Sequence, residues 1–370
     1  MAGIYYHIPF CKRICSYCDF YRTAQIDRLP RIIEAMCEEL HRRSVYLRGE
    51  PIRTRYFGGG TPSLCTPQQI KQLIDTSSQL FDCSQVVETT LEANPDDLHE
   101  DYLEALLSIG IDRLSIGIQS FDDGCLKLMN RRHTALQAEQ AIRRAQQVGF
   151  KNLTIDLIFG VPGFGGESFE RSIDKALALG VQHISAYLLT IEPRTRFGVM
   201  AARGELTECD EATCEAEYML LHERLTAAGY EHYEISNYAL PGYRARHNSS
   251  YWDGTPYLGI GPAAHSFDGV SRQWNASSVD RYLEGQAPER EELTRENQID
   301  ELLMTRLRTA EGLDLRAMQE RFGPQLCERI LREARPLIEQ GRLQLHEGRL
   351  WIPAREFLRS DAIISSLFEG

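Results

Sequence analysis

The sequence predicts an α/β fold in which residues 1–205 form a six-stranded parallel sheet with helices on its outside. Three observations lead to this prediction. Short β-rich runs alternate six times with longer amphipathic segments over this part of the chain. Gly110, Gly149 and Gly180 each follow an amphipathic segment, at the position where helices commonly stop. After residue 205 the pattern changes to short runs rich in aromatic and turn residues.

Six βα units, rather than eight, favour a partial barrel over a closed one, although a doubly wound sheet also fits the pattern. In such barrels the chemistry lies where the βα loops converge, at the C-terminal ends of the strands. The predicted strands are 4–9, 53–59, 86–94, 112–119, 152–159 and 183–190. The predicted helices between them lie near 28–47, 67–80, 98–109, 123–148 and 166–179.

The rest of the chain predicts two further domains, an aromatic-rich extension at 206–290 and a small α+β domain at 291–370. The extension begins with a helix near 209–228 and continues as short extended runs, YEHYEISNYA, RHNSSYWDG and YLGIGPAAHSF. The last domain is expected to have helices near 297–309, 314–322 and 325–340 and a hairpin at 343–353. That order is similar to a winged helix. Its acidic residues outnumber its arginines and it has no lysine, which favours a substrate cover or a partner-docking surface over a DNA reader.

Composition limits the classes of partner and location. The net charge of −12 argues against a nucleic-acid partner, which would require a basic face. No signal segment precedes Cys11, and no apolar run is long enough to span a bilayer. The 10 cysteines, without a secretory signal, are expected to be thiols and cluster ligands in a reducing compartment rather than disulfides. We therefore expect a cytoplasmic protein.

Three cysteines near the start of the chain predict a metal centre. Cys11, Cys15 and Cys18 have the spacing C-x3-C-x2-C directly after the first predicted strand. Soft thiolate ligands select iron–sulfur clusters or zinc. Zinc would require a fourth ligand nearby, and the next cysteine, Cys37, lies in a predicted helix without a partner at short spacing. The count favours a [4Fe–4S] cluster with three irons held by protein and one iron open.

This spacing, with Tyr17 before the last cysteine, resembles the signature of the radical S-adenosylmethionine (SAM) superfamily. The stretches YYHIPFC and FGGGTPS, at 5–11 and 57–63, resemble the branch that holds the oxygen-independent coproporphyrinogen III oxidases and the HemW heme chaperones. The resemblance implies a partial (β/α)6 radical SAM barrel. It also implies a [4Fe–4S] cluster whose open iron is chelated by the amino and carboxylate groups of SAM.

Several polar residues near the predicted strand ends are candidates for SAM binding. Glycines after the second strand let a ligand approach the backbone closely, and polar residues among apolar neighbours require partners when they are buried. The resemblance places the loop of Gly59, Gly60 and Thr61 on the methionine amino group. The remaining roles that it implies are Glu92 near the amine, Arg131 on the carboxylate, Gln119 and Asp156 on the ribose hydroxyls, Tyr17 against the adenine and Tyr5 near the SAM carboxylate. Arg132 could serve in place of Arg131.

A second motif, HNxxYW, covers residues 247–252. From the residues alone, a capped turn with aromatic rings packed into the core is one interpretation. A flat-ligand site with an imidazole ligand is the other. The motif resembles the HemW chaperones, which implies heme binding with His247 as the axial ligand, oriented by Asn248. His7 and His265 are the next candidates for the heme ligand.

Two functions follow from the resemblance, a heme chaperone that passes heme to an acceptor protein and a coproporphyrinogen III dehydrogenase. The oxidases usually carry another cysteine where this chain has Phe20, and an N-terminal arm before the cluster. Together with HNxxYW, these differences favour a heme carrier over an enzyme; a radical SAM enzyme that acts on another tetrapyrrole is a third interpretation. The expected partners are heme and an acceptor, for which a membrane-associated respiratory protein is a candidate, with a peripheral membrane position for the heme-loaded form.

Overall fold

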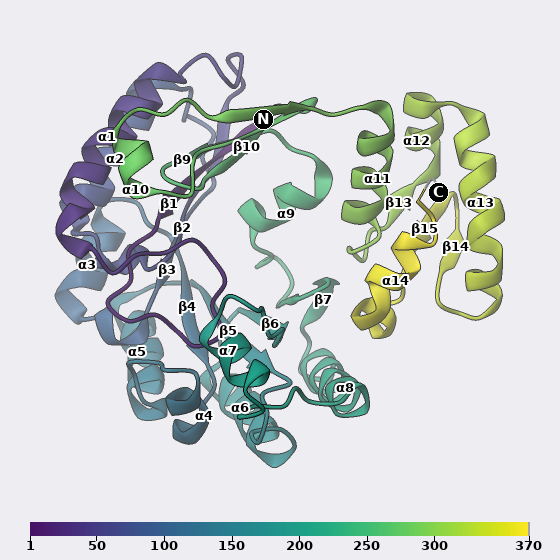
Figure 1. The fold of residues 1–370 in the computed structure, drawn as a ribbon, viewed down its shortest axis with the longest axis horizontal. Helices are drawn as coiled ribbons and strands as arrows, with labels where there is room; N and C mark the ends of the chain where they lie inside the picture. Colours follow the sequence, from purple (N-terminus) through teal and green to yellow (C-terminus); the bar gives the residue numbers. More distant parts are fainter. Residues whose placement is uncertain (369–370) are drawn as a thin grey trace.

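Six parallel strands follow one another across one sheet in chain order, as Figure 1 shows for the computed structural model, which describes residues 1–368. They are β1 (Ala2–Ile8), β2 (Ile52–Gly59), β3 (Glu88–Ala93), β4 (Arg113–Gln119), β5 (Asn152–Phe159) and β6 (His183–Leu188). Their side chains are largely buried on both faces, as expected for parallel strands under helices. β1 does not pair with β6, so the sheet is open. The predicted partial barrel is confirmed.

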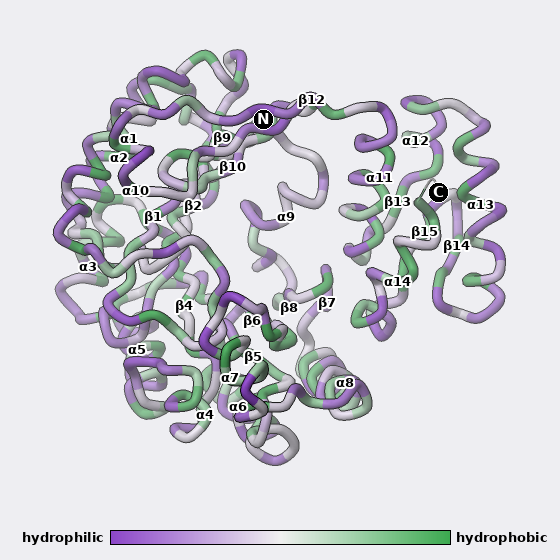
Figure 2. The backbone as a smooth tube through the Cα atoms, in the orientation of Figure 1, coloured by the Kyte–Doolittle hydropathy of each residue, from purple (hydrophilic) through white to green (hydrophobic). Residues whose placement is uncertain are grey.

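Helices cover the outer face of this sheet (Figure 1). They are α1 (Leu29–Arg42), α2 (Pro67–Leu80), α3 (Glu100–Ser108), α4 (Asp123–Leu128), α5 (Ala135–Val148) and α6 (Glu167–Leu179). Figure 2 shows hydrophobic and hydrophilic residues alternating along them. In α1, Ile32, Ile33, Met36 and Leu40 are fully buried. Burying one such side chain contributes about 1.5–3 kcal/mol, and this burial fixes the helix on the sheet.

The predicted helix at 123–148 is wrong in one respect, because two helices, α4 and α5, replace it. Asn130 lies between them with a left-handed φ of 59°. Thr134 then begins α5 with a capping box, in which its side chain and that of Gln137 satisfy each other's backbone N–H groups. The break turns Arg131 toward the centre of the sheet, where it contacts the cysteine loop.

The segment 206–290 adds strands to both edges of the sheet. After α7 (Arg196–Ala202) and α8 (Glu211–Ala227), two antiparallel strands extend the β6 edge, β7 (Glu231–Glu234) and β8 (Asn237–Ala239). At the other edge β9 (Tyr257–Ile260) runs parallel to β1. It is followed by β10 (His265–Phe267), β11 (Ser271–Trp274), α10 (Val279–Leu283) and β12 (Glu289–Glu292). The sheet therefore has twelve strands, in the order β12-β11-β10-β9-β1-β2-β3-β4-β5-β6-β8-β7.

The run RHNSSYWDG was expected to be extended, and this is wrong: it forms the helix α9 (Arg246–Asp253), which crosses between the two edges (Figure 1). No side chain of its own sequence caps its first turn. Instead Glu88 of β3 accepts hydrogen bonds from the N–H groups of Arg246 and His247, at 3.0 and 2.9 Å. A carboxylate from a distant strand thus satisfies the free N–H groups of the helix and favours its dipole.

The C-terminal residues form a separate helical unit around a small sheet. Its elements are α11 (Arg295–Arg306), β13 (Leu313–Asp314), α12 (Leu315–Phe322), α13 (Pro324–Glu339), β14 (Gln344–His346), β15 (Arg349–Trp351) and α14 (Ser360–Ser365). The predicted order of three helices and a hairpin is present. The N–H of Ile235, directly after β7, donates to the carbonyl oxygen of Arg308 at 3.0 Å and so ties the unit to this edge of the sheet. Within residues 1–368, no helix combines the length and the apolar character needed to cross a membrane.

Candidate cluster and cofactor site

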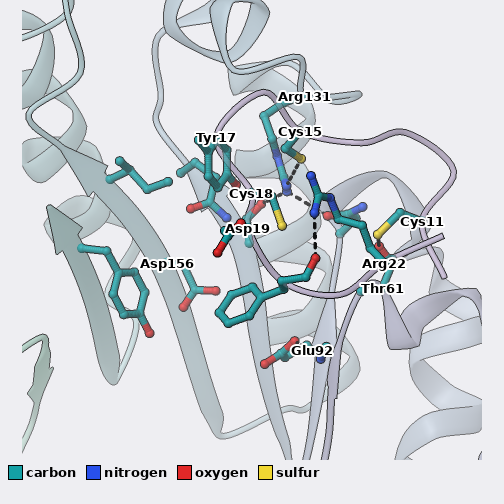
Figure 3. A pocket seen from close by; sticks show the side chains of 18 of the residues that line it. Cys11, Cys15, Tyr17, Cys18, Asp19, Arg22, Thr61, Glu92, Arg131 and Asp156 are labelled. Atoms are coloured by element: carbon teal, nitrogen blue, oxygen red, sulfur yellow. Dashed lines mark hydrogen bonds between the residues drawn. The ribbon is translucent and has the colours of Figure 1, made fainter. Parts of the chain in front are cut away.

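A cavity of about 460 Å³ lies at the C-terminal ends of the parallel strands (Figure 3). Every residue predicted for the cluster or for SAM lines it, except Tyr5. Figure 3 shows Cys11, Cys18, Glu92 and Asp156 around one space. The convergence follows from the topology, because parallel strands end at the same edge of the sheet and their loops meet there.

Backbone hydrogen bonds hold the loop that carries the three cysteines. Cys11 N–H donates to Thr23 at 2.9 Å, which closes the loop, and Ser16 N–H donates to Met129 at 2.9 Å, which ties it to the end of α4. All three thiols are free, and they line the same cavity. Arg131 donates to Cys15 Sγ at 3.3 Å, and Thr61 Oγ1 donates to Cys11 Sγ at 3.4 Å.

The electrostatic surroundings of the thiols include opposing effects. Burial raises the pKa of Cys11 and of Cys18, while the positive charge of Arg22 lowers both. Metal ligation requires thiolates, and a bound metal supplies the charge that stabilises them.

The donor set fits an iron–sulfur cluster better than a single ion. Within residues 1–368 no three His, Cys, Asp or Glu side chains are close enough to hold one metal ion together. Thiolates that ligate different irons of a cluster stand farther apart than ligands of one ion, so three separated thiols around a shared space suit a cluster. Other thiols lie elsewhere, since Cys37 accepts from Thr76 on α2 and Cys65 is buried in the core.

The glycine loop after β2 packs directly against the cysteine loop. A Cβ on Gly60 would lie 2.8 Å from the Phe10 oxygen and 2.8 Å from the Pro9 carbonyl carbon, so only glycine fits there. Gly59 has a φ of 109° and donates its N–H to Glu92 Oε2 at 3.1 Å. The loop therefore brings polar backbone groups to the cavity wall beside Cys11.

Glu92 is held by a chain of contacts that begins in α9. Tyr56 of β2 donates to Glu92 Oε1 at 2.7 Å. The ring of His247 stacks on Tyr56 with centroids 5.0 Å apart. Burial raises the pKa of Glu92, and the bonds from Tyr56 and from Gly59 N–H oppose that shift. The sequence analysis did not select Tyr56, although its position before FGGG on an inward-facing strand was a usable signal.

Asp156 of β5 lines the same cavity, near Glu92. Burial and the nearby charge of Glu92 raise the pKa of Asp156 to about 7, and Ser115 donates to it at 3.3 Å. Ser115 and Tyr187 also line the cavity, and the sequence analysis missed both.

Gln119 ends β4 with a left-handed φ of 71°, which is uncommon for a residue with a side chain. Such strained conformations cluster at functional sites.

Of the two adjacent arginines, the structure brings Arg131 to the cavity. Its guanidinium also donates to Asn94 Oδ1 at 2.8 Å and to the Gly117 carbonyl oxygen. Arg132 instead forms salt bridges with Asp96 and Asp97, at 3.1 and 3.0 Å. Its charge is therefore compensated outside the cavity lining.

Two predicted site residues lie outside the cavity. The hydroxyl of Tyr5 is 2.9 Å from His7 Nδ1, on the inward face of β1. His247 is fully buried, and both of its ring nitrogens have hydrogen-bond partners, Thr54 Oγ1 at 2.8 Å and Tyr251 OH at 2.9 Å. These two hydroxyls, and not Asn248, orient the imidazole. In this conformation His247 has no nitrogen free for iron, so its role as heme ligand stays a prediction.

Comparisons with known proteins agree with the geometry. Residues 5–176 match the Radical SAM superfamily, and residues 293–359 match the HemN C-terminal domain. The chain is 33% identical over 361 residues to "Heme chaperone HemW" of Bacillus subtilis, covering 95% of each chain. It is 34% identical to "Heme chaperone HemW" of Mycobacterium tuberculosis, covering 99% of this chain and 94% of the relative. The solved structure of coproporphyrinogen III oxidase (HemN) from Escherichia coli superposes with a TM-score of 0.85 at 23% identity, over 99% of this chain and 90% of that one.

Proposed function

The chain belongs to the HemW heme chaperone family of the radical SAM superfamily, and from this premise we propose that it carries heme to an acceptor protein. The observation that carries the proposal is the similarity to HemW heme chaperones over nearly the whole length of both chains. Heme, a [4Fe–4S] cluster and SAM are the proposed ligands. The likeness to HemN supports the fold alone, because the two sequences differ at most positions.

In this proposal the cysteine loop holds the cluster and the cavity holds SAM. Cys11, Cys15 and Cys18 supply the three thiolates. The chemistry that such a cluster supplies is electron transfer to SAM. Arg131 and Arg22 neutralise part of the negative charge that accumulates on the thiolates.

The SAM pocket combines one carboxylate near each end of a zwitterionic, ribose-bearing ligand. Glu92 and the Gly59–Thr61 loop bind the methionine amino group, and Arg131 binds its carboxylate. Asp156 and Gln119 form hydrogen bonds with the ribose hydroxyls. All of these groups line the same cavity, where a buried polar group without a partner is costly and a ligand that satisfies it gains affinity.

The test is an anaerobic reconstitution of the full chain with iron and sulfide, followed by a heme titration and two product assays. We expect stoichiometric heme binding, seen in the Soret band, release of heme to an apo-heme acceptor, and no decarboxylation of coproporphyrinogen III. Turnover of coproporphyrinogen III with formation of 5′-deoxyadenosine would instead identify a dehydrogenase. Heme binding no stronger than that of an unrelated protein would reject the chaperone proposal.

A further inference from the structure

His265 is the first residue of β10 and lies on the inward face of the extended sheet. Its neighbour Ser266 is buried and accepts from Arg43, directly after α1, at 3.0 Å, so Ser266 faces the outer helices. Because side chains alternate along a strand, His265 and Phe267 face the opposite side. Phe267 contacts Tyr257, which in turn contacts Tyr251 of the HNxxYW helix, with centroids 6.4 and 4.8 Å apart.

The imidazole of His265 is exposed and free. Its ring makes no hydrogen bond within the described part of the chain, in contrast to His7 and His247, whose ring nitrogens are all in contact with partners. Partial burial and the charge of Arg272 lower the pKa of His265, which leaves a neutral ring with a lone pair.

Trp274 of β11 gives the imidazole a fixed aromatic neighbour. The two residues pair across the strands, and their rings stack with centroids 6.0 Å apart and an interplanar angle of 25°. Glu289 accepts a hydrogen bond from the indole N–H at 3.1 Å and so holds the indole in place. The exposed imidazole and the half-buried indole therefore form one aromatic ledge.

A polar depression of about 430 Å³ adjoins this ledge. Trp274 belongs to its lining, together with Ser277, Ser278, Arg281 and Glu289, whose carboxylate accepts from the indole N–H. The guanidinium of Arg281 is exposed and has no carboxylate partner within residues 1–368, unlike Arg28, which pairs with Asp280 at 2.6 Å. A free cation and two hydroxyls beside an aromatic ledge suit the carboxylates of an otherwise apolar planar ligand.

We propose that His265 is the axial ligand of the carried iron porphyrin, with Trp274 against its plane and Arg281 on a propionate. This inference rests on the proposed function, because it assigns the residues that hold the heme. Axial ligation sets an imidazole upright on a porphyrin, so the porphyrin lies across the edges of the imidazole and indole rings, an edge-to-face contact that aromatic systems favour. Iron binds the free imidazole nitrogen without loss of an existing hydrogen bond.

The position also relates the heme to the rest of the site. His265 lies near His7, because its partner strand β9 runs beside β1, and a proton on one ring would disfavour a proton on the other. The Nε2 of His7 is 3.3 Å from the carbonyl oxygen of Tyr21, in the segment that follows the three cysteines. His265 thus lies near the segment that follows the cluster loop, and its strand neighbour Phe267 contacts the aromatic row that ends in the HNxxYW helix.

The experiment is a heme titration of the reconstituted full chain and of four variants, read by the Soret band and by the heme dissociation constant. We expect His265→Ala to lose or shift the Soret band and to bind heme at least tenfold more weakly, with partial recovery when free imidazole is added. His346→Ala is the matched control, because His346 is also exposed but lies on β14, and it should bind heme like the wild type. Arg281→Gln should weaken heme but not heme dimethyl ester, which has no propionate charge.

The fourth variant, His247→Ala, separates the two possible ligands. If His247→Ala loses the Soret band while His265→Ala keeps the wild-type band and affinity, the assignment of His265 is overturned and the carrier function stands. If the wild type itself fails to bind heme above the level of an unrelated protein, the proposed function falls. Cluster absorbance and SAM affinity, measured for each variant, show whether the fold is retained.

Discussion

Removing the hydroxyl of Tyr56 should weaken SAM binding although this residue is not expected to touch SAM. Tyr56 donates to Glu92 at 2.7 Å, and both side chains are largely enclosed. A hydrogen bond to a charged group contributes about 1.5–3 kcal/mol, so Tyr56→Phe should reduce SAM affinity roughly ten- to hundredfold. The carboxylate loses a donor that stabilises its ionised form, so the pKa of Glu92, already raised by burial, rises further.

The sign of the pH effect distinguishes this mechanism from simple loss of stability. In Tyr56→Phe, Glu92 is protonated up to a higher pH and cannot accept from the amino group of SAM, so affinity should recover as the pH is raised. The assay is SAM titration of the reconstituted protein at several pH values, with the thermal midpoint measured in parallel.

Tyr6→Phe is the matched control for this prediction. Tyr6 is a buried tyrosine of the adjacent strand, and its hydroxyl donates a long bond of 3.4 Å to the carbonyl oxygen of Leu73, on the helix-covered face and away from Glu92. It should leave SAM affinity unchanged. If Tyr56→Phe lowered the thermal midpoint but left SAM affinity and its pH profile unchanged, the positioning role of Tyr56 would be refuted.

Three further outcomes are expected. Replacing any of the three loop cysteines by serine, for example Cys18→Ser, should abolish the visible absorbance of the reconstituted cluster, whereas Cys65→Ser should not; an essential Cys65 would contradict the three-ligand assignment. The pKa of Asp156 is about 7, and its ionised form is the better acceptor for ribose hydroxyls, so wild-type SAM affinity should fall by up to about tenfold per pH unit below 7. Asp156→Asn should flatten this pH profile when SAM affinity is measured by calorimetry, and an unchanged slope would assign the titration to another group. Gly60→Ala should lower the thermal midpoint and the yield of cluster and should reduce the free energy of unfolding by about 1–3 kcal/mol, because the new Cβ meets the backbone of Pro9 and Phe10. A variant that reconstitutes fully and is equally stable would show that the two loops can separate.

The sequence determined the barrel and, together with the family resemblance, many of the residues that line the cavity. Both ends of each of the six strands lie within two residues of the predicted positions. These elements follow local rules, because apolar periodicity and glycine stops act within a few residues of each other. The cavity followed from one further rule, that parallel strands bring their C-terminal loops together.

The tertiary structure decided features whose cause lies far away in the chain. Helix α9 forms because Glu88, more than 150 residues earlier, binds the N–H groups of its first turn. The same contact draws His247 into the interior, where Thr54 and Tyr251 occupy both ring nitrogens, while His265 stays free at the sheet edge. The HNxxYW motif shows which side chains are present, but not which partners they meet. Which imidazole retains a free lone pair depends on hydrogen bonds between distant strands, and only the folded chain brings those partners together.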